Sequence, residues 1–468
     1  MLPLFLAVLL LPSAAGALTR EEARHLLVRS GFAAEPAEIA AFEPLSRTEA
    51  VERLLREAGS EARAPAPPWT VGWRPPRLED LSSEERRLLR RQNRERGLEL
   101  KGWWMREMAT SPAPLTEVMT LFWHNHFTSS LRKVKAPVLL YRQNVLFRKE
   151  ALGNFARLLH AVARDPAMLV YLDGARSKKD APNENFAREL FELFTLGEGH
   201  FGEADVKDAA RAFTGWSLDR QSGAFHLREG WHDGGEKTVL GQRGRFDGED
   251  VIALLLDHPR TAAFVVEKLW RTFVSETPEP AEVQRLARLF REAGYEIKPL
   301  LAAIFTSDAF WAAENRGRLI KSPVDLLVGT LRLFDLPVED YGDLARLSRR
   351  LGQDLFDPPN VKGWPGGSDW ITTASLLDRQ ALLARVTGGK ARATMQRSAM
   401  QDASSTGRAG RARLFDAWVD GLPATWQSAE SVSLLLLAVP AVDVEVLDLR
   451  ASGAQVRQLL SDPAYQVK

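Results

Sequence analysis

Residues 183–197, which read NENFARELFELFTLG, contain the pattern that decides the fold. Their apolar residues recur at three- and four-residue intervals, which is the period of an α-helix with one buried face. The polar residues at positions i, i+3, i+4 and i+7 are Asn185, Arg188, Glu189 and Glu192. Gly197 is a typical left-handed helix stop. The stretch therefore predicts an amphipathic helix over 183–196.

The same period recurs along most of the chain. Apolar residues at helical spacing predict further helices over 114–126, 137–150, 154–164, 203–213, 248–257, 261–274, 281–293, 298–306, 322–334 and 341–350. Three helix starts carry the spacing of a capping box, namely Thr19 with Glu22, Ser46 with Glu49, and Ser82 with Glu85. The sequence predicts an all-α, or mainly α, fold arranged as a large multi-helical orthogonal bundle.

Some segments depart from this pattern and suggest how the chain is divided. Residues 18–387 are predicted to form the main helical domain, interrupted by a Pro-rich connector at 60–80 and a hairpin insertion at 223–246. Residues 352–370 combine Gly, Pro and Trp, which is typical of an ordered loop packed on its own side chains. Residues 388–413 are predicted to be a flexible basic tether, and 414–468 a C-terminal segment that packs on the main domain.

Composition and the N-terminus restrict compartment and partners. Residues 1–17 form an uncharged apolar run ending in small residues, the pattern of a secretory signal peptide cleaved after Ala17. We expect an exported protein, periplasmic or extracellular, with no integral membrane segment after cleavage. The net charge of +1 offers no global field for nucleic acid, so none is expected as a partner. The absence of cysteine excludes disulfides, thiolate metal sites and cysteine nucleophiles.

Two clusters of candidate site residues lie on predicted helices. His126 falls on the apolar stripe of helix 114–126, whereas His124 is about 200° away around the same helix. On helix 183–196, Glu189 and Glu192 lie on one stripe with Asn185 and Arg188, and adjacent carboxylates can hold a cation or act as acid and base. The alternatives are a core histidine with a surface one, and a solvated helix face with an Arg188–Glu192 pair.

Two further clusters lie in Gly-rich loops. The turn 231–238 brings together His232, Asp233 and Lys237, and its alternative reading is a capped hairpin turn. The loop 358–370 offers Asn360 and Lys362 beside Trp364 and Trp370, a composition suited to a sugar ring or another flat ligand; its alternative is a self-packed loop. We hypothesise that the four clusters form one site.

An arginine-rich run covers residues 84–101. Acidic residues are interleaved with its arginines, which favours a solvated helix face over a phosphate-binding surface, and we assign it no function.

Six motifs in order resemble a known bacterial family. They are FWHNHFT, NENFARELFELFTLG with EADVKDAARAFTGW, HDGGEKTVLG, KLW at 268–270, IKSPVDLLVG at 320–329 and PPNVKGWPGG. The chain resembles the exported, uncharacterised family called domain of unknown function 1800, over about residues 19–387 and again at its end. The resemblance implies export and an exported partner of the alkaline-phosphatase-like type. It implies no activity, and many relatives have His where this chain has Phe194.

Two hypotheses of function follow. In the first, the protein is a metal-assisted hydrolase of an envelope or extracellular polymer. Its catalytic residues are His124, His126, Glu189, His232 and Asp233, with a divalent metal on His126, Glu189 and Glu192. Substrate would be bound by Asn185, Arg188, Lys237, Asn360, Lys362, Trp364 and Trp370. In the second, the protein is a non-catalytic binding or assembly protein, its polar clusters are structural networks, and the loop 358–370 is the recognition surface.

Overall fold

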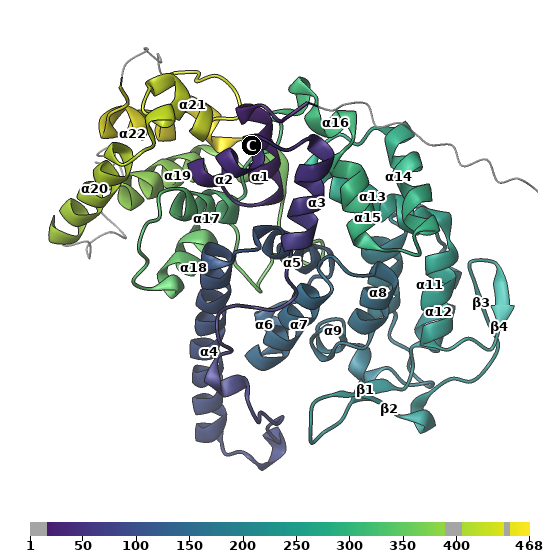
Figure 1. Ribbon diagram of the computed structural model, residues 1–468. Helices are drawn as coiled ribbons and strands as arrows, with labels where there is room; N and C mark the ends of the chain where they lie inside the picture. The colour runs from purple at the N-terminus through teal and green to yellow at the C-terminus, as the bar shows by residue number, and fades with distance from the viewer. Residues whose placement is uncertain (1–15, 389–404, 444–449) are drawn as a thin grey trace, which may run out of the picture.

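The computed structural model describes residues 16–388, 405–443 and 450–468 (Figure 1). These residues are mainly α-helical and include two small antiparallel sheets, which confirms the predicted fold class. The predicted signal peptide lies outside the described residues except for its last two positions. No helix in the described part of the chain combines the length and apolar character needed to cross a membrane.

The first half of the chain contains α1 (Arg20–Ser30), α2 (Pro36–Phe42), α3 (Arg47–Glu57), α4 (Ser83–Thr110), α5 (Pro114–His126), α6 (Leu131–Val134), α7 (Pro137–Lys149), α8 (Phe155–Ala163), α9 (Pro166–Tyr171), α10 (Glu184–Glu189) and α11 (Glu203–Ala212). All three predicted capping boxes are present, at the starts of α1, α3 and α4. The connector 60–80 holds only two short 3-10 turns, and its Trp69 donates to Glu99 on α4 at 2.8 Å.

The second half contains α12 (Gly248–Asp257), α13 (Pro259–Phe273), α14 (Pro280–Glu292), α15 (Ile297–Phe305), α16 (Asp308–Trp311), α17 (Pro323–Leu333), α18 (Tyr341–Arg350), α19 (Thr373–Val386), α20 (Ser405–Asp420), α21 (Ala429–Leu436) and α22 (Gly453–Ser461). The predicted tether therefore differs from the structure at 405–413, which begin α20, while 389–404 lie outside the described residues.

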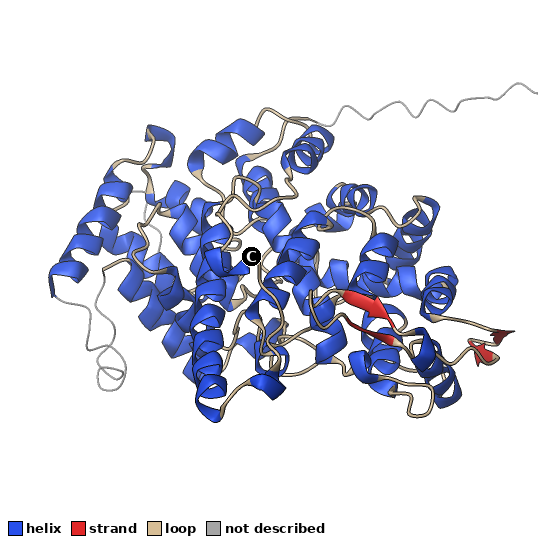
Figure 2. Cartoon of the chain, turned by 90° about the horizontal axis from the view of Figure 1, so that it is seen from below, coloured by secondary structure: helices blue, strands red, loops and turns tan. Residues whose placement is uncertain are grey.

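The β structure is a pair of hairpins at one edge of the molecule. β1 (Trp216–Leu218) pairs with β2 (Phe225–Leu227), and β3 (Lys237–Val239) pairs with β4 (Gln242–Gly244). The insertion thus begins before the predicted residue 223 and has two hairpins instead of one. Figure 1 places β3 and β4 at the periphery, away from α5, and Figure 2 likewise shows a strand pair at the edge of the molecule.

The helix predicted over 183–196 changes its winding halfway. α10 ends at Glu189, and Leu190–Thr195 form a π-helical turn, in which Leu196 N–H donates to the carbonyl of Phe191 at 2.8 Å. The wider turn inserts one residue into the helix, a feature that recurs near functional positions. Gly197 has the left-handed conformation expected of a helix stop, with φ of +81°.

The chain end joins the middle of the sequence. Lys468 N–H donates to the carbonyl of Leu319 at 2.7 Å, and Lys321 N–H donates to the carbonyl of Gln466 at 2.8 Å. The Lys468 ammonium lies 2.9 Å from Asp325 at the start of α17. These bonds hold the last residues beside α5 and the loop 352–370, where the candidate site lies.

Candidate functional site

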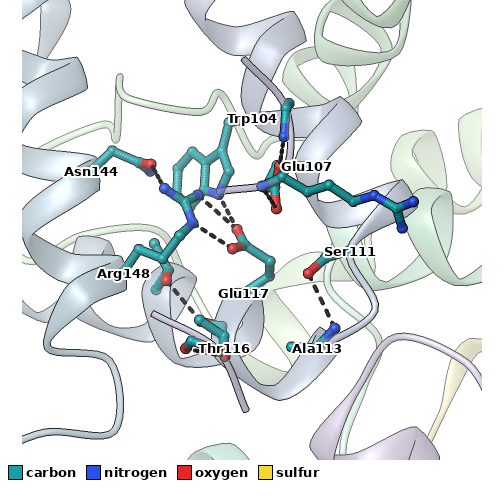
Figure 3. A network of polar contacts seen from close by, with 12 residues as sticks. Trp104, Glu107, Ser111, Ala113, Thr116, Glu117, Asn144 and Arg148 are labelled. Carbon is teal, nitrogen blue, oxygen red and sulfur yellow. Dashed lines mark hydrogen bonds and ion pairs between the residues drawn. The ribbon is translucent and has the colours of Figure 1, made fainter. Parts of the chain in front are cut away.

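His124 belongs to a closed polar network inside the helical core. Arg148 of α7 makes a two-pronged ion pair with Glu117 of α5, at 2.6 and 2.9 Å, and both side chains are 1% exposed (Figure 3). Trp104 donates to the same carboxylate at 3.0 Å. Burying this ion pair is tolerable because each charge has its partner and further hydrogen bonds.

The orientation of the Asn144 side-chain amide determines the protonation and the hydrogen-bonding role of His124. Arg148 donates to the amide oxygen of Asn144 at 2.6 Å, which leaves the amide nitrogen to donate to His124 Nε2 at 3.0 Å. His124 is therefore a hydrogen-bond acceptor in a neutral form. Burial and the nearby charge of Arg148 hold the pKa of His124 well below its ordinary value. The ring is enclosed by Trp104, Phe147 and Phe356, and its hydrogen bond and ring contacts are with groups of the fold.

His126 caps the end of the neighbouring helix. Its Nε2 lies 3.1 Å from the carbonyl oxygen of Phe194, and its Nδ1 lies 3.1 Å from the ammonium of Lys268 on α13. Lys268 also donates to the carbonyl of Leu193 at 2.9 Å. The last carbonyls of a helix have no partners within it, and in the core they need donors from outside. His126 and Lys268 supply them.

These surroundings disfavour the protonated forms of both Lys268 and His126. Burial lowers the pKa of Lys268 to about 7, assisted by the charge of Arg271. Burial, followed by the charge of Lys268, holds the pKa of His126 well below its usual value. Both ring nitrogens of His126 are engaged, and the structure does not bring His126, Glu189 and Glu192 together as the predicted metal set. Within the described residues no three His, Asp or Glu side chains are grouped so as to hold a metal ion.

Glu189 is a predicted site residue whose functional group is unengaged. Its side chain is largely buried at the junction of α10 and the π-helical turn, and it makes no hydrogen bond or ion pair with the described residues. Burial raises the pKa of Glu189, Glu192 raises it further, and Arg188 and Lys362 oppose the rise. A carboxyl group with a raised pKa is a candidate acid.

Of the other predicted site residues on this helix, Arg188 and Asn185 have structural partners, whereas Glu192, like Glu189, makes no hydrogen bond or ion pair with the described residues. Arg188 pairs with Glu203 at 2.7 Å and Glu184 at 3.1 Å, not with Glu192 as the sequence suggested. The amide of Asn185 donates to the carbonyl of Leu172 at 3.3 Å. These contacts do not orient Arg188 or Asn185 toward His126.

The turn 231–238 is fixed to α11 and closed on itself. Asp233 accepts from Arg211 at 2.8 Å, which lowers the pKa of Asp233, and His232 Nδ1 lies 3.0 Å from the carbonyl of Thr214. Lys237 is buried and donates to the carbonyls of Asp233 and Gly235 at 2.5 and 3.0 Å. Burial lowers the pKa of Lys237. No hydrogen bond or ion pair between described residues joins this turn to α5, so the structure shows no direct link between this cluster and the histidines.

The other three segments do meet at the end of α5. While His126 contacts the π-helical turn, the neighbouring Asn125 accepts from the backbone N–H of Trp364 at 2.6 Å. Gly363 lies directly against Asn125 with φ of +95°, and a Cβ there would be 2.3 Å from the Asn125 amide oxygen. Only glycine fits this close approach. Asn125 thus fastens the loop 352–370 to α5.

Within that loop Asn360 and Lys362 are exposed, whereas the tryptophans are buried. Asn360 accepts from the N–H of Lys362 at 2.8 Å within a tight turn, and the Lys362 ammonium reaches Glu198 at 3.4 Å on the surface. Trp364 and Trp370 are buried, and the Trp364 indole donates to the carbonyl of Asp354 at 3.1 Å. The loop is ordered by its tryptophans, which agrees with the self-packed reading.

The same tryptophans also form part of a pocket of about 180 Å³. Its apolar lining includes Phe122, Trp364 and Trp370, and polar groups come from Asn125, Arg271 and Glu276. Glu276 lies against Gly367, where a Cβ would be 2.3 Å from its carboxylate. We call this the tryptophan pocket. Aromatic walls with a few converging polar groups are typical of small-molecule sites.

Sequence reasoning missed half of this pocket. In the sequence, Asn125 is distinguished only by its position between two histidines. Arg271 and Glu276 lie about 90 residues before the loop 352–370, with no motif of their own. The proximity of such segments comes from helix packing, which no local pattern records.

The structure is that of a mainly α-helical protein with a small pocket of mixed aromatic and polar lining. The chain belongs to the family described as Protein of unknown function (DUF1800), whose model matches residues 25–467. No match was found among curated proteins or among solved structures.

Proposed function

We propose that this protein is an exported binding protein that holds one polar ring of an envelope or extracellular polymer in the tryptophan pocket. The observation that carries the proposal is the pocket's lining, in which Trp364 and Trp370 stand beside Asn125, Arg271 and Glu276. A sugar ring presents apolar C–H faces to aromatic walls and hydroxyls to polar groups. The volume of about 180 Å³ suits a single ring better than a long segment of polymer.

The state of the histidines supports binding over metal-assisted hydrolysis. His124 and His126 are neutral, buried and bonded to groups of the fold, and His232 and Asp233 are held by Thr214 and Arg211. A hydrolase reading retains one supporting observation, the unengaged carboxyl of Glu189 with its raised pKa. That reading requires Glu189 to act on a substrate as a general acid.

Export and the partner belong to the same proposal. The apolar run over 1–17 supports secretion, and the family resemblance supports an exported alkaline-phosphatase-like partner. A protein that binds polymer without cleaving it has a role beside an enzyme that modifies that polymer. That nucleic acid is not a partner stays a prediction from the charge balance.

Export predicts a specific mass. Protein recovered from the cell envelope or the medium is expected to lack residues 1–17, because signal peptidase cleaves after small residues such as Ala15 and Ala17. Intact-mass spectrometry measures this directly. A recovered chain that retains residues 1–17 would contradict export by this route.

Substitution of Glu276 tests the pocket without disturbing the core, because its side chain is exposed at the rim. We expect wild-type protein to bind N-acetylglucosamine or glucose in a calorimetric titration, and Glu276→Gln to weaken that binding about tenfold or more. Hydrogen bonds from neutral donors to a charged acceptor contribute about 1.5–3 kcal/mol.

Glu279→Gln is the matched control, since Glu279 is also exposed, lies three residues away and does not line the pocket. Its affinity should equal that of wild type. Equal losses in both variants, or no binding of either sugar by wild type, would contradict a sugar site at the tryptophan pocket.

A further inference from the structure

A second pocket lies between α4, α6 and α18, away from the tryptophans. Its volume is about 640 Å³, which is in the usual range for small-molecule sites. α4 and α18 lie side by side along one flank of the molecule (Figure 1). Their backbones approach closely where a Cβ on Gly102 would be 3.0 Å from the N of Gly342. Beyond this crossing the two helices and α6 enclose the pocket.

The wall from α4 carries cations on a single helical stripe. Arg90, Arg94 and Lys101 line the pocket together with Gly97. These positions are separated by three or four residues, so they share one face. The interleaved acids lie on another stripe, where Glu95 pairs with Arg91 at 3.0 Å and Glu99 accepts from Trp69. The sequence therefore suggested a balanced solvated face, whereas the helix separates its charges onto two faces.

The opposite walls are also basic. Arg346 and Arg349 line the pocket from α18, and Arg132 and Lys135 line it from α6 and the residue after it. Lys135 is held in place because its carbonyl accepts from Asn93 of α4 at 2.8 Å.

One carboxylate, Asp357, is among the lining residues, and it is already engaged. It accepts from Ser130 at 2.5 Å and pairs with Arg132 at 2.8 Å. Behind the wall, Asp354 pairs with Lys101 and lies 3.5 Å from Arg349. These acids offset part of the positive charge.

Three cations of the lining remain without a counter-charge. Arg90, Arg94 and Lys135 are exposed and make no side-chain hydrogen bond or ion pair with the described residues. Like charges that converge on one concave surface repel each other unless an anion lies between them. Guanidinium groups bind phosphate and carboxylate oxygens in two-pronged geometry. The floor adds apolar contact from Leu98, Leu131 and Pro137.

We infer that this basic pocket binds a small organic molecule that carries two or more phosphate or sulfate groups. Arg90 and Arg94 on α4 and Lys135 beyond α6 supply separate cations for separate anionic groups, and the apolar floor accepts the body of the molecule. The two lining arginines of α18, Arg346 and Arg349, are already paired with acids. The site is independent of the tryptophan pocket, because the residues that line the two pockets do not overlap and binding here requires none of Trp364, Trp370 or Glu276.

The test is a calorimetric titration of the full chain with pyrophosphate, inorganic sulfate and acetate at low and at physiological salt. Pyrophosphate is expected to bind at least tenfold more tightly than acetate, because it presents several charges to the facing cations. Arg90→Gln combined with Arg94→Gln should weaken pyrophosphate binding at least tenfold. Sulfate tighter than pyrophosphate would assign the site to sulfated ligands.

Arg86→Gln combined with Arg87→Gln is the matched control, since it removes the same charge from exposed positions of the same helix outside the pocket. Its affinity should change less than twofold. Equal losses in the two double variants would show attraction by overall charge and overturn the pocket, as would wild-type protein that binds pyrophosphate no better than acetate. Thermal melts followed by circular dichroism should coincide for all three proteins, because neither pair contributes a contact to the fold.

Discussion

Glu117→Gln is expected to lower the free energy of unfolding by about 3–5 kcal/mol, because it leaves the guanidinium of Arg148 buried without its counter-charge. Both side chains are 1% exposed, so water cannot replace the lost partner. Trp104 and Asn144 would also lose the arrangement that the carboxylate and guanidinium maintain. Denaturation in urea measures the change as a lower midpoint.

Glu95→Gln provides the comparison. Glu95 also pairs with an arginine, Arg91 at 3.0 Å, but the two side chains are 62% and 71% exposed. Exposed pairs contribute less than about 1 kcal/mol, so this variant should unfold close to wild type. Similar midpoints for Glu117→Gln and Glu95→Gln would mean that the buried network does not stabilise the fold and that His124 is not held as described.

Lys268→Met is expected to change how stability depends on pH. The pKa of Lys268 is about 7 in the folded protein and about 10.4 in an unfolded chain. Between these values the unfolded chain binds a proton that the folded protein lacks, so the free energy of unfolding rises with pH. Relative to Lys268→Met, wild type should gain on the order of 4 kcal/mol between pH 7 and pH 10.

Lys298→Met controls for the removal of a lysine, because Lys298 is exposed on α15. Its stability curve should run parallel to that of wild type across the same pH range. His126 adds little slope there, since its pKa lies below this range both in the unfolded chain, at about 6.5, and in the folded protein, where it is lower still. If Lys268→Met and wild type also give parallel curves, Lys268 is charged in the fold and does not cap the helix as a neutral amine.

Local patterns predicted the elements well. α5, α12 and α18 begin and end at the predicted residues, because apolar periodicity, an N-terminal proline or an acidic first turn act within a few residues of the boundary. The π-helical turn in 190–195 was not predictable from periodicity. It depends on donors from outside the helix, His126 and Lys268, which the sequence places about 70 residues away on either side.

The site was predicted only in part, for the same reason. A polar residue among aromatics indicates that it has a partner, and His124, His126 and Lys237 all have one. The pattern does not say whether the partner is a ligand or another part of the fold. In these three cases it is the fold, and the open pockets lie where segments without motifs meet, at Glu276 and at the α4–α18 crossing.

One measurement tests the central claim most directly, that ligand is held in the tryptophan pocket and not processed by the acidic group on α10. Retention on an insoluble cell-envelope polymer, with assay of released sugar, is compared for wild type, Glu276→Gln and Glu189→Gln. Both substitutions replace a carboxylate with an amide of the same shape. The account predicts that Glu276→Gln alone loses retention and that no protein releases sugar. Release of sugar by wild type that disappears in Glu189→Gln, with retention unchanged in Glu276→Gln, would contradict it.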